Sequence, residues 1–257
     1  MNSHTPSAEL TRRQIIKQFS LCTAASIIGG KLWTGRVLAD VTAGAPNVGR
    51  VTINVADYPA LMTEGGSVQF KFNNGFLGQH FPFTVSRDIN DIFHAVDTNC
   101  THEDGIVGPF VSANGFMECP LHYSQFTISG QYISGDASGN LNCFPTSYNA
   151  NSGLLTVEIP GLQTRINAIN VQSTTATTTR FRLQFPSTST FIYGVQYRAN
   201  LTDSPVYVNF ATNPSAVIPV SPVTSQLTGN GSVRTIYVDA TGTTGFFTVA
   251  LMVTPYP

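Results

Sequence analysis

Two short segments of this chain each carry one cysteine and one histidine, and together they constrain its fold more than any other feature. The sequence C-T-H at residues 100–102 is followed after sixteen residues by C-P-L-H at residues 119–122. Thiolate and imidazole are both metal ligands, so a site that uses all four needs two loops that meet at one end of a rigid scaffold. Tetrahedral zinc also accepts two Cys and two His, although zinc fingers usually group Cys with Cys and His with His.

The two segments resemble the ligand loops of the Rieske [2Fe–2S] family, and the match includes G-F-M-E at residues 115–118, which leads into the second cysteine. In this family one iron is bound by two thiolates and the other by two imidazoles. The resemblance therefore implies one [2Fe–2S] cluster per chain. It assigns Cys100 and Cys119 to the inner iron, and His102 and His122 to the outer iron.

The residues around the ligands indicate how such a cluster is tuned. Rieske proteins of cytochrome bc complexes have a further cysteine in each loop, joined as a disulfide, where this chain has Gly105 and Leu121. In those proteins a Ser and a Tyr donate hydrogen bonds to sulfur; here the Ser is kept as Ser124, but the Tyr is Phe126. Donors to sulfur stabilise the reduced, more negative state, so the loss of one predicts an intermediate or low potential within the family's range of about −150 to +300 mV. Tyr123, which replaces the usual Gly, is a second candidate donor.

The N-terminal sequence T-R-R-Q-I-I-K at residues 11–17 resembles a twin-arginine (Tat) export signal. An apolar stretch follows at residues 19–30, and V-L-A at residues 37–39 is a small-residue cleavage site. We therefore expect residues 1–39 to be a signal peptide and the mature protein to be periplasmic or otherwise exported. Lys31 ends the apolar stretch well short of the about 20 residues that span a bilayer, so membrane association is expected only if the signal is retained. A basic amphipathic helix on a cytoplasmic protein is the alternative interpretation.

The remaining cysteines do not form a second ligand pair. Cys22 lies within the predicted signal, and Cys143 is left alone in the mature chain. An unpaired cysteine in an exported protein is a candidate free thiol, and for Cys143 we expect a buried packing role.

Short alternating runs bounded by turn residues predict an all-β protein, because helical periodicity is scarce after the signal. In residues 46–162, which form the predicted Rieske domain, the expected strands are 51–55, 67–72, 83–86, 92–97, 116–118, 125–128, 131–134 and 154–159. The fold implied by the resemblance is a multi-sheet antiparallel β domain. Residues 163–257 have five further alternating runs, at 181–185, 191–197, 206–210, 233–238 and 246–252. They predict a small sandwich like that of immunoglobulin or fibronectin type III modules, with an unassigned role.

Charge separates the two halves. Residues 46–162 contain three Lys or Arg and ten Asp or Glu, whereas residues 163–257 contain five Arg and two Asp. The acidic residues near the ligands, Glu103, Asp104 and Glu118, form either an ordinary solvated surface or a docking face for a basic redox partner. Basic residues are few and dispersed, so no nucleic-acid partner is expected.

A catalytic site of the oxygenase type is not expected. Such enzymes add a mononuclear iron held by two His and a carboxylate. The mature chain has two other histidines, His80 and His94, and their spacing does not form that motif. His94 is expected to be a strand residue and His80 a loop residue.

These observations favour an exported one-electron carrier, or an electron-transfer subunit of a periplasmic redox complex whose partner is a cytochrome or a molybdenum enzyme subunit. The small subunit of arsenite oxidase resembles this chain in combining a twin-arginine signal with a Rieske domain, but it lacks the C-terminal segment. The alternative is a cell-envelope adhesion or assembly protein, in which the C-terminal sandwich is the working part and the cluster is structural. No catalytic residue is assigned.

Overall fold

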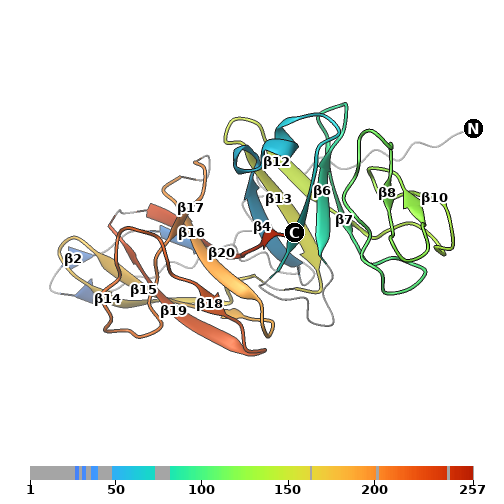
Figure 1. The fold of residues 1–257 in the computed structure, drawn as a ribbon. Helices are drawn as coiled ribbons and strands as arrows, with labels where there is room; N and C mark the ends of the chain where they lie inside the picture. The colour runs from blue at the N-terminus through green and yellow to red at the C-terminus, as the bar shows by residue number, and fades with distance from the viewer. Residues whose placement is uncertain are drawn as a thin grey trace, which may run out of the picture.

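The computed structural model describes residues 27–28, 31–32, 36–39, 48–72, 82–162, 164–200, 203–241 and 244–256. These residues form β-strands and two short 3₁₀-helices, η1 (Val55–Asp57) and η2 (Pro59–Met62). Most strand pairs are antiparallel and lie in several sheets, so the predicted all-β, multi-sheet fold is confirmed. Figure 1 shows an elongated molecule, with β8 (Met117–Glu118) and β10 (Tyr132–Ser134) near one end and β14 (Ala168–Thr174) near the other.

The largest sheet runs through both halves of the chain. Its order is β12–β13–β4–β20–β16–β17. Strand β20 pairs in parallel with β4 on one side and antiparallel with β16 on the other. The bounds are β12 (Thr146–Asn149), β13 (Leu154–Pro160), β4 (Val48–Asn54), β20 (Thr244–Leu251), β16 (Ile192–Arg198) and β17 (Val206–Val208). Two further strands join it, β18 (Leu227–Thr228) beside β16 and β3 (Arg36–Ala39) beside β20. The sequence of the C-terminal half therefore completes a sheet that begins in the N-terminal half.

Alternation of apolar and polar residues explains why β4 and β13 pair. Val51 and Ile53 on β4, and Leu155 and Val157 on β13, are at most 2% exposed, and the residues between them are partly exposed. A period of two puts one face of each strand in the core, which fixes the register. Burial of four such side chains contributes on the order of 1.5–3 kcal/mol each before the entropy of folding is subtracted.

A five-stranded sheet, built mainly from the N-terminal half of the chain, leads into the first ligand loop, which follows its strand β7. Its order is β11–β7–β6–β5–β21, with β11 (Cys143–Phe144), β7 (Phe93–Asp97), β6 (Phe83–Arg87), β5 (Ser67–Lys71) and β21 (Thr254–Pro255). The C-terminal segment thus returns to the N-terminal half, where β21 pairs with β5 and the Tyr256 N–H donates to the Gln69 carbonyl at 2.8 Å. Figure 1 places the C-terminus in the middle of the molecule, beside this half.

The C-terminal half has the two layers expected of a sandwich. A three-stranded sheet of β14, β15 (Thr179–Pro186) and β19 (Val233–Ala240) packs on the long sheet. Phe181 on β15 lies 6.2 Å from Phe247 on β20, measured between ring centroids. The hydrophobic core then continues into the first half, since Phe72 and Phe191 contact each other with ring centroids 5.2 Å apart. The two predicted domains, divided at residue 162, therefore share one hydrophobic core. That each of them is a separate domain stays a prediction.

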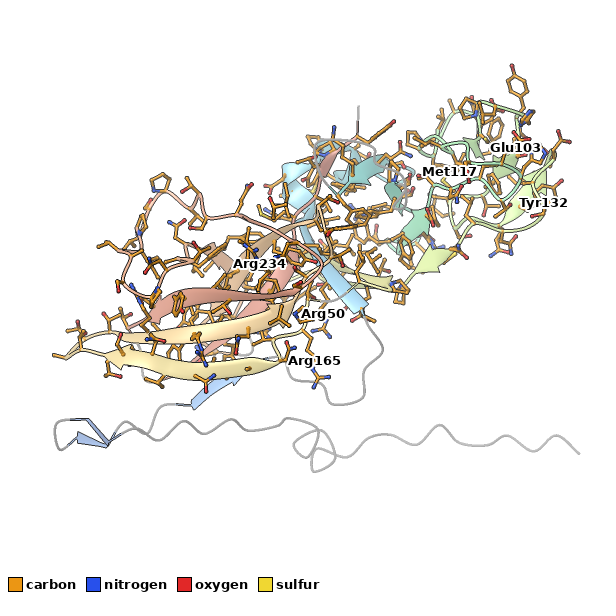
Figure 2. All side chains as sticks on the ribbon, turned by 90° about the horizontal axis from the view of Figure 1, so that it is seen from below. Arg50, Glu103, Met117, Tyr132, Arg165 and Arg234 are labelled. Carbon is orange, nitrogen blue, oxygen red and sulfur yellow. The ribbon has the colours of Figure 1, made fainter. Side chains whose placement is uncertain are left out.

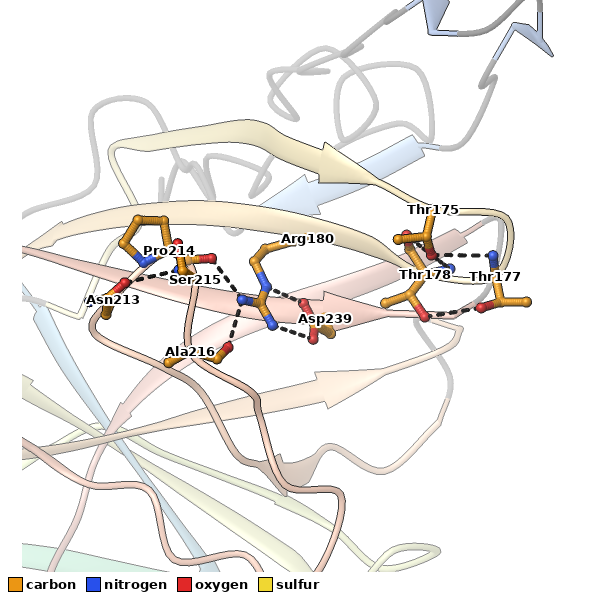
Figure 3. Close-up of polar contacts among 9 residues, drawn as sticks. All are labelled: Thr175, Thr177, Thr178, Arg180, Asn213, Pro214, Ser215, Ala216 and Asp239. Atoms are coloured by element: carbon orange, nitrogen blue, oxygen red, sulfur yellow. Dashed lines mark hydrogen bonds and ion pairs between the residues drawn. The ribbon is translucent and has the colours of Figure 1, made fainter.

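A partly buried arginine fixes a long loop over this outer sheet (Figure 3). Arg180 pairs with Asp239 through two N–O contacts of 2.7 and 2.8 Å. Its remaining nitrogen donates to the carbonyls of Pro214 and Ala216 at 2.8 and 2.7 Å. The planar guanidinium fork suits this double role, and the paired Asp239 raises the pKa of Arg180.

Whereas the first ligand loop follows β7, the second ligand loop connects two strands of a separate small sheet, β10–β9–β8, in which β9 is Gln125–Phe126. Its core is built from the following residues: Val96, Cys100, Val107, Met117, Cys119, Phe126, Ala137 and Leu141. Figure 2 shows Glu103, Met117 and Tyr132 together at this end of the molecule, far from Arg165 and Arg234. We call it the cluster end.

Every strand predicted from sequence has a counterpart, with ends that differ by a few residues. The strands that were missed include β14, an edge strand in which no residue is buried and which therefore shows no apolar alternation. The prediction of a buried Cys143 was wrong, because β11 is an edge strand and this free thiol is exposed, donating to the Ser129 carbonyl at 3.3 Å.

Little of the predicted export signal falls in the described part of the chain. Its twin-arginine motif lies outside the described residues, and so does His80. Ile27–Ile28 (β1) and Lys31–Leu32 (β2) form a short antiparallel pair, and β3 includes the predicted cleavage residues 37–39. Removal of residues 1–39 stays a prediction. Among the described residues, no helix is both long and apolar enough to cross a bilayer.

Candidate metal centre

The first ligand loop follows β7 and is closed by backbone hydrogen bonds. The Cys100 N–H donates to the Gly105 carbonyl at 2.9 Å, and the Val107 N–H donates to the Thr98 carbonyl at 2.8 Å. Cys100 is 5% exposed, whereas His102 is exposed. The loop therefore turns its thiol inward and its imidazole outward.

The second ligand loop connects β8 to β9 and has the same polarity. The Cys119 N–H donates to the Ser124 carbonyl, and the Tyr123 N–H donates to the Cys119 carbonyl, both at 2.9 Å. Cys119 is 1% exposed, and His122 is exposed. Gly108, just after the first loop, donates its N–H to the Glu118 carbonyl at 2.9 Å and so ties the two loops together.

The four predicted ligands come together as an inner pair and an outer pair. Cys100 and Cys119 lie in the same buried cluster, where burial raises the pKa of the Cys119 thiol and the neighbouring Cys100 thiol raises it further, against opposing backbone hydrogen bonds from Leu121 and His122. The rings of His102 and His122 have centroids 4.7 Å apart and are inclined at 76°. The structure thus separates soft, buried sulfur donors from exposed nitrogen donors.

This separation fits a two-iron cluster better than a single zinc ion. One tetrahedral zinc would need all four donor atoms around one point. In the described part of the chain, the group of three or more candidate ligands whose donor atoms lie within 4.8 Å of one another is His102, Glu103 and His122, without either cysteine. Glu103 approaches His122 with 3.9 Å between Oε2 and Nδ1. Two thiolates on an inner iron and two imidazoles on an outer iron are the donor set of a Rieske cluster.

Gly105 provides space beside the inner pair. A Cβ atom at this position would lie 2.8 Å from the Cys119 Sγ and 2.9 Å from the Leu121 Cδ1. These contacts are shorter than ordinary van der Waals contact. In this chain, where Leu121 replaces the other disulfide cysteine, a side chain at position 105 would have to displace Leu121 or the Cys119 sulfur, a role of glycine that the sequence comparison with disulfide-bearing loops did not identify.

A third segment, residues 135–139, holds both ligand loops and was not found from sequence. The Thr101 hydroxyl donates to the Gly139 carbonyl at 2.8 Å, and the Ser138 hydroxyl donates to the Thr101 carbonyl at 2.7 Å. On the other loop, the Ala137 N–H donates to the Ser124 Oγ at 2.9 Å. These hydrogen bonds brace loops that have no disulfide between them. The short G-D-A-S-G run, typical of a turn, was the available signal.

The candidate tuning residues have different surroundings. Ser124 is fully buried, and its oxygen already accepts from Ala137, which leaves its own O–H as the group that can donate toward a cysteine or cluster sulfur. Tyr123 is 67% exposed and has a φ of 57°. No hydrogen bond from its hydroxyl to sulfur is found among the described residues, so a tuning role for Tyr123 stays a prediction. Phe126 is fully buried and offers no donor.

His94, one of the two other histidines of the mature chain, lies on β7 as predicted. Its Nε2 is 3.0 Å from the Asp88 Oδ2, and this hydrogen bond is the main reason that the pKa of Asp88 is lowered. Asp88 also accepts the N–H groups of Asn90 and Ile92 at 2.8 and 2.9 Å. The pair closes the β6–β7 turn and is explained by that structural role.

Comparison with known proteins identifies the cluster end. Residues 63–145, which contain all four ligands, match the family model of the Rieske [2Fe–2S] domain. No curated protein matches the chain. Among solved structures, the cyanobacterial plasma membrane Rieske protein PetC3 from Synechocystis PCC 6803 is 27% identical, over 42% of this chain and 99% of that one, with a TM-score of 0.32.

Two other solved structures are more distant. A protein described as the small subunit of an NADH-dependent nitrite reductase from Mycobacterium tuberculosis is 16% identical, over 45% of this chain and 98% of that one, with a TM-score of 0.29. The quaternary ammonium Rieske monooxygenase CntA is 9% identical, over 76% of this chain and 68% of that one, with a TM-score of 0.37. The family match alone makes residues 63–145 of this chain a Rieske [2Fe–2S] domain, which implies a [2Fe–2S] cluster as its cofactor and indicates an iron–sulfur electron-transfer role.

Proposed function

We propose that this chain is an exported one-electron carrier, or the electron-transfer subunit of a periplasmic redox complex similar in arrangement to the small subunit of arsenite oxidase. The observation that carries the proposal is the division of the four ligands into a buried pair, Cys100 and Cys119, and an exposed pair, His102 and His122. When bound there, a [2Fe–2S] cluster supplies a centre that takes up and releases single electrons.

Both the buried and the exposed ligand residues support that role. The buried thiols sit in a small apolar core, which keeps water away from the inner ligands. The exposed imidazoles bring the outer ligands to the protein surface, where a partner protein can approach closely. Hydrogen bonds from residues 135–139 hold both loops in place, so little reorganisation of the protein is needed when the charge of the centre changes.

The residues near sulfur favour an intermediate or low potential. Phe126 removes one donor, and the two positions that form a disulfide in cytochrome bc proteins are Gly105 and Leu121. Ser124 remains as a buried donor. Protein-film voltammetry tests this argument: we expect a reversible one-electron wave below the upper part of the family's range, and a potential near about +300 mV would contradict it.

Export by the twin-arginine route rests on the motif at residues 11–17. Fusion of residues 1–45 to a reporter that is active only outside the cytoplasm tests it, with the Arg12→Lys/Arg13→Lys variant as the matched control. We expect export that the double substitution abolishes. Equal reporter activity for both fusions would remove the basis for a periplasmic location.

Redox cycling of the purified protein distinguishes the carrier function from the alternative, an adhesion or assembly protein in which the cluster is structural. A carrier exchanges electrons reversibly with a small-molecule mediator at a rate that supports turnover. A cluster that cannot be reduced and reoxidised without loss of iron would favour the structural role.

A further inference from the structure

The surface around the outer ligands combines an apolar centre with an acidic rim. Leu121 and Tyr123, which flank His122, are 53% and 67% exposed. The carboxylates of Glu103 and Asp104 on the first loop, and of Asp136 on the third segment, are also exposed. We call these five residues the docking surface. A tyrosine beside a redox ligand, with charges at the edge, has the anatomy of a protein–protein contact.

Tyr123 occupies a backbone conformation that tyrosine rarely adopts. Its φ of 57° lies in the left-handed region, where a bulky side chain is strained and glycine is not. The turn imposes this conformation, because the Tyr123 N–H must reach the Cys119 carbonyl while the Ser124 carbonyl accepts the Cys119 N–H. Glycine would close the same turn without strain. An exposed ring contributes little to the core, so the strain at this site points to a function rather than to stability.

The charge around the ligand loops has one sign. Residues 98–145, which contain both ligand loops and the third segment, have four Asp or Glu and no Lys or Arg. A surface of this kind attracts a cationic partner and repels an anionic one, and it raises the association rate most at low ionic strength. Charge complementarity therefore indicates that the protein that binds to the docking surface has a basic surface.

We propose that Tyr123 is the central contact of an electron-transfer interface and that the partner is a redox protein with a basic surface around its own redox group. This proposal rests on the electron-transfer function above and names the partner class of the same site. In the exchange, one electron leaves the reduced protein and reduces one oxidised partner molecule, with no bond formed or broken. The strain at Tyr123 is retained because the ring contacts that partner.

The test uses the complete holoprotein and ferricytochrome c as a basic probe partner. Tyr123→Gly removes both the strain and the ring, so it should raise the midpoint of thermal unfolding by about 2–4 °C and lower the second-order rate of cytochrome c reduction at low salt about tenfold. The EPR spectrum should be unchanged, and because Tyr123 is also a candidate donor to sulfur, the reduction potential of each variant is measured and the rates are compared at equal driving force. Asp104→Asn/Asp136→Asn should also lower the rate about tenfold and flatten its dependence on salt.

Two controls are needed. One distinguishes loss of a partner contact from a change in stability, and the other distinguishes the charge of the partner from its haem chemistry. Thr190→Gly changes another left-handed residue, with a φ of 70°, in the C-terminal half, and should leave the reduction rate unchanged. Succinylated cytochrome c, which keeps its haem but has an acidic surface, should react much more slowly than the native probe. The proposal is overturned if Tyr123→Gly leaves the rate unchanged or lowers the unfolding midpoint, or if the succinylated probe reacts as fast as the native one. Absence of a reversible EPR signal from the unaltered protein would instead refute the electron-transfer function itself.

Discussion

Gly105→Ala is the substitution that most directly tests how the two ligand loops fit together. The added Cβ would lie 2.8 Å from the Cys119 Sγ, and ordinary contact begins near 3.4 Å, so the sulfur or the loop must move by about 0.6 Å. The Leu121 side chain, 2.9 Å away, can rotate, but the Cys119 sulfur would be held in place by the proposed cluster. Overpacking of this kind costs about 1–3 kcal/mol.

The cost should appear in both cluster content and stability. We expect Gly105→Ala to be isolated with less than half the iron and acid-labile sulfide of the unaltered protein. The loaded fraction should unfold about 2–12 °C lower, because the cost of about 1–3 kcal/mol shifts the midpoint of a protein of this size by about 2–4 °C per kcal/mol. Iron and sulfide analysis and thermal unfolding followed by circular dichroism measure the two effects.

Gly139→Ala is the matched control for this prediction. Gly139 lies on the third segment, and an added Cβ there meets no atom within 4 Å. Its carbonyl, which accepts from Thr101, is unchanged by the substitution. Gly139→Ala should therefore load and unfold like the unaltered protein. Full cluster content and an unchanged unfolding midpoint for Gly105→Ala would show that the loops do not pack as described.

Three further substitutions test other parts of the structure. Ser124→Ala should lower the reduction potential by about 40–65 mV, the equivalent of one lost hydrogen bond of about 1–1.5 kcal/mol, and an unchanged value in film voltammetry would exclude Ser124 as a donor to sulfur. Asp88 has a pKa lowered from 3.8 chiefly by the hydrogen bond from His94, so its carboxylate stabilises the fold above that value and the gain is lost as pH falls through the lowered pKa. Asp88→Asn should flatten the fall in stability measured by urea unfolding between about pH 5 and pH 2, and a curve as steep as that of the unaltered protein would contradict the assignment. Arg180→Met leaves Asp239 without its partner and should cost about 2–4 kcal/mol in guanidinium unfolding, whereas a loss below about 0.5 kcal/mol would show that the network in Figure 3 adds little.

The ligands and most strands were accessible from the sequence because both depend on local spacing. The C-x-H and C-x-x-H motifs place a thiol and an imidazole on one loop, and alternating runs such as Phe181 to Phe185 predict strands directly. Strands without alternation were not predicted: β14 and β21 are edge strands with no buried residue, and they acquire their form by pairing with a neighbour.

The other structural features that were not predicted from sequence depend on contacts between residues far apart in the chain. The division into two domains rests on a change in composition and charge near residue 162 and stays a prediction, but neither feature indicates that β20 pairs with β4, almost two hundred residues earlier. The brace from Ser138 to Thr101 joins residues 37 positions apart, and nothing in either local sequence marks the other. The prediction that Cys143 is buried failed for a similar reason, since hydrophobicity alone does not reveal that its strand lies at a sheet edge.

The central claim is that Cys100 and Cys119 hold one iron and His102 and His122 hold the other. The most direct measurement is pulsed EPR of the natively purified, reduced protein, which detects nitrogen nuclei coupled to the electron spin, combined with iron and sulfide analysis of the same sample. We expect two irons and two sulfides per chain and two coupled imidazole nitrogens, with the signal lost in His102→Ala and in His122→Ala. A colourless protein that contains one zinc per chain, or a cluster spectrum without imidazole nitrogen coupling, would contradict it.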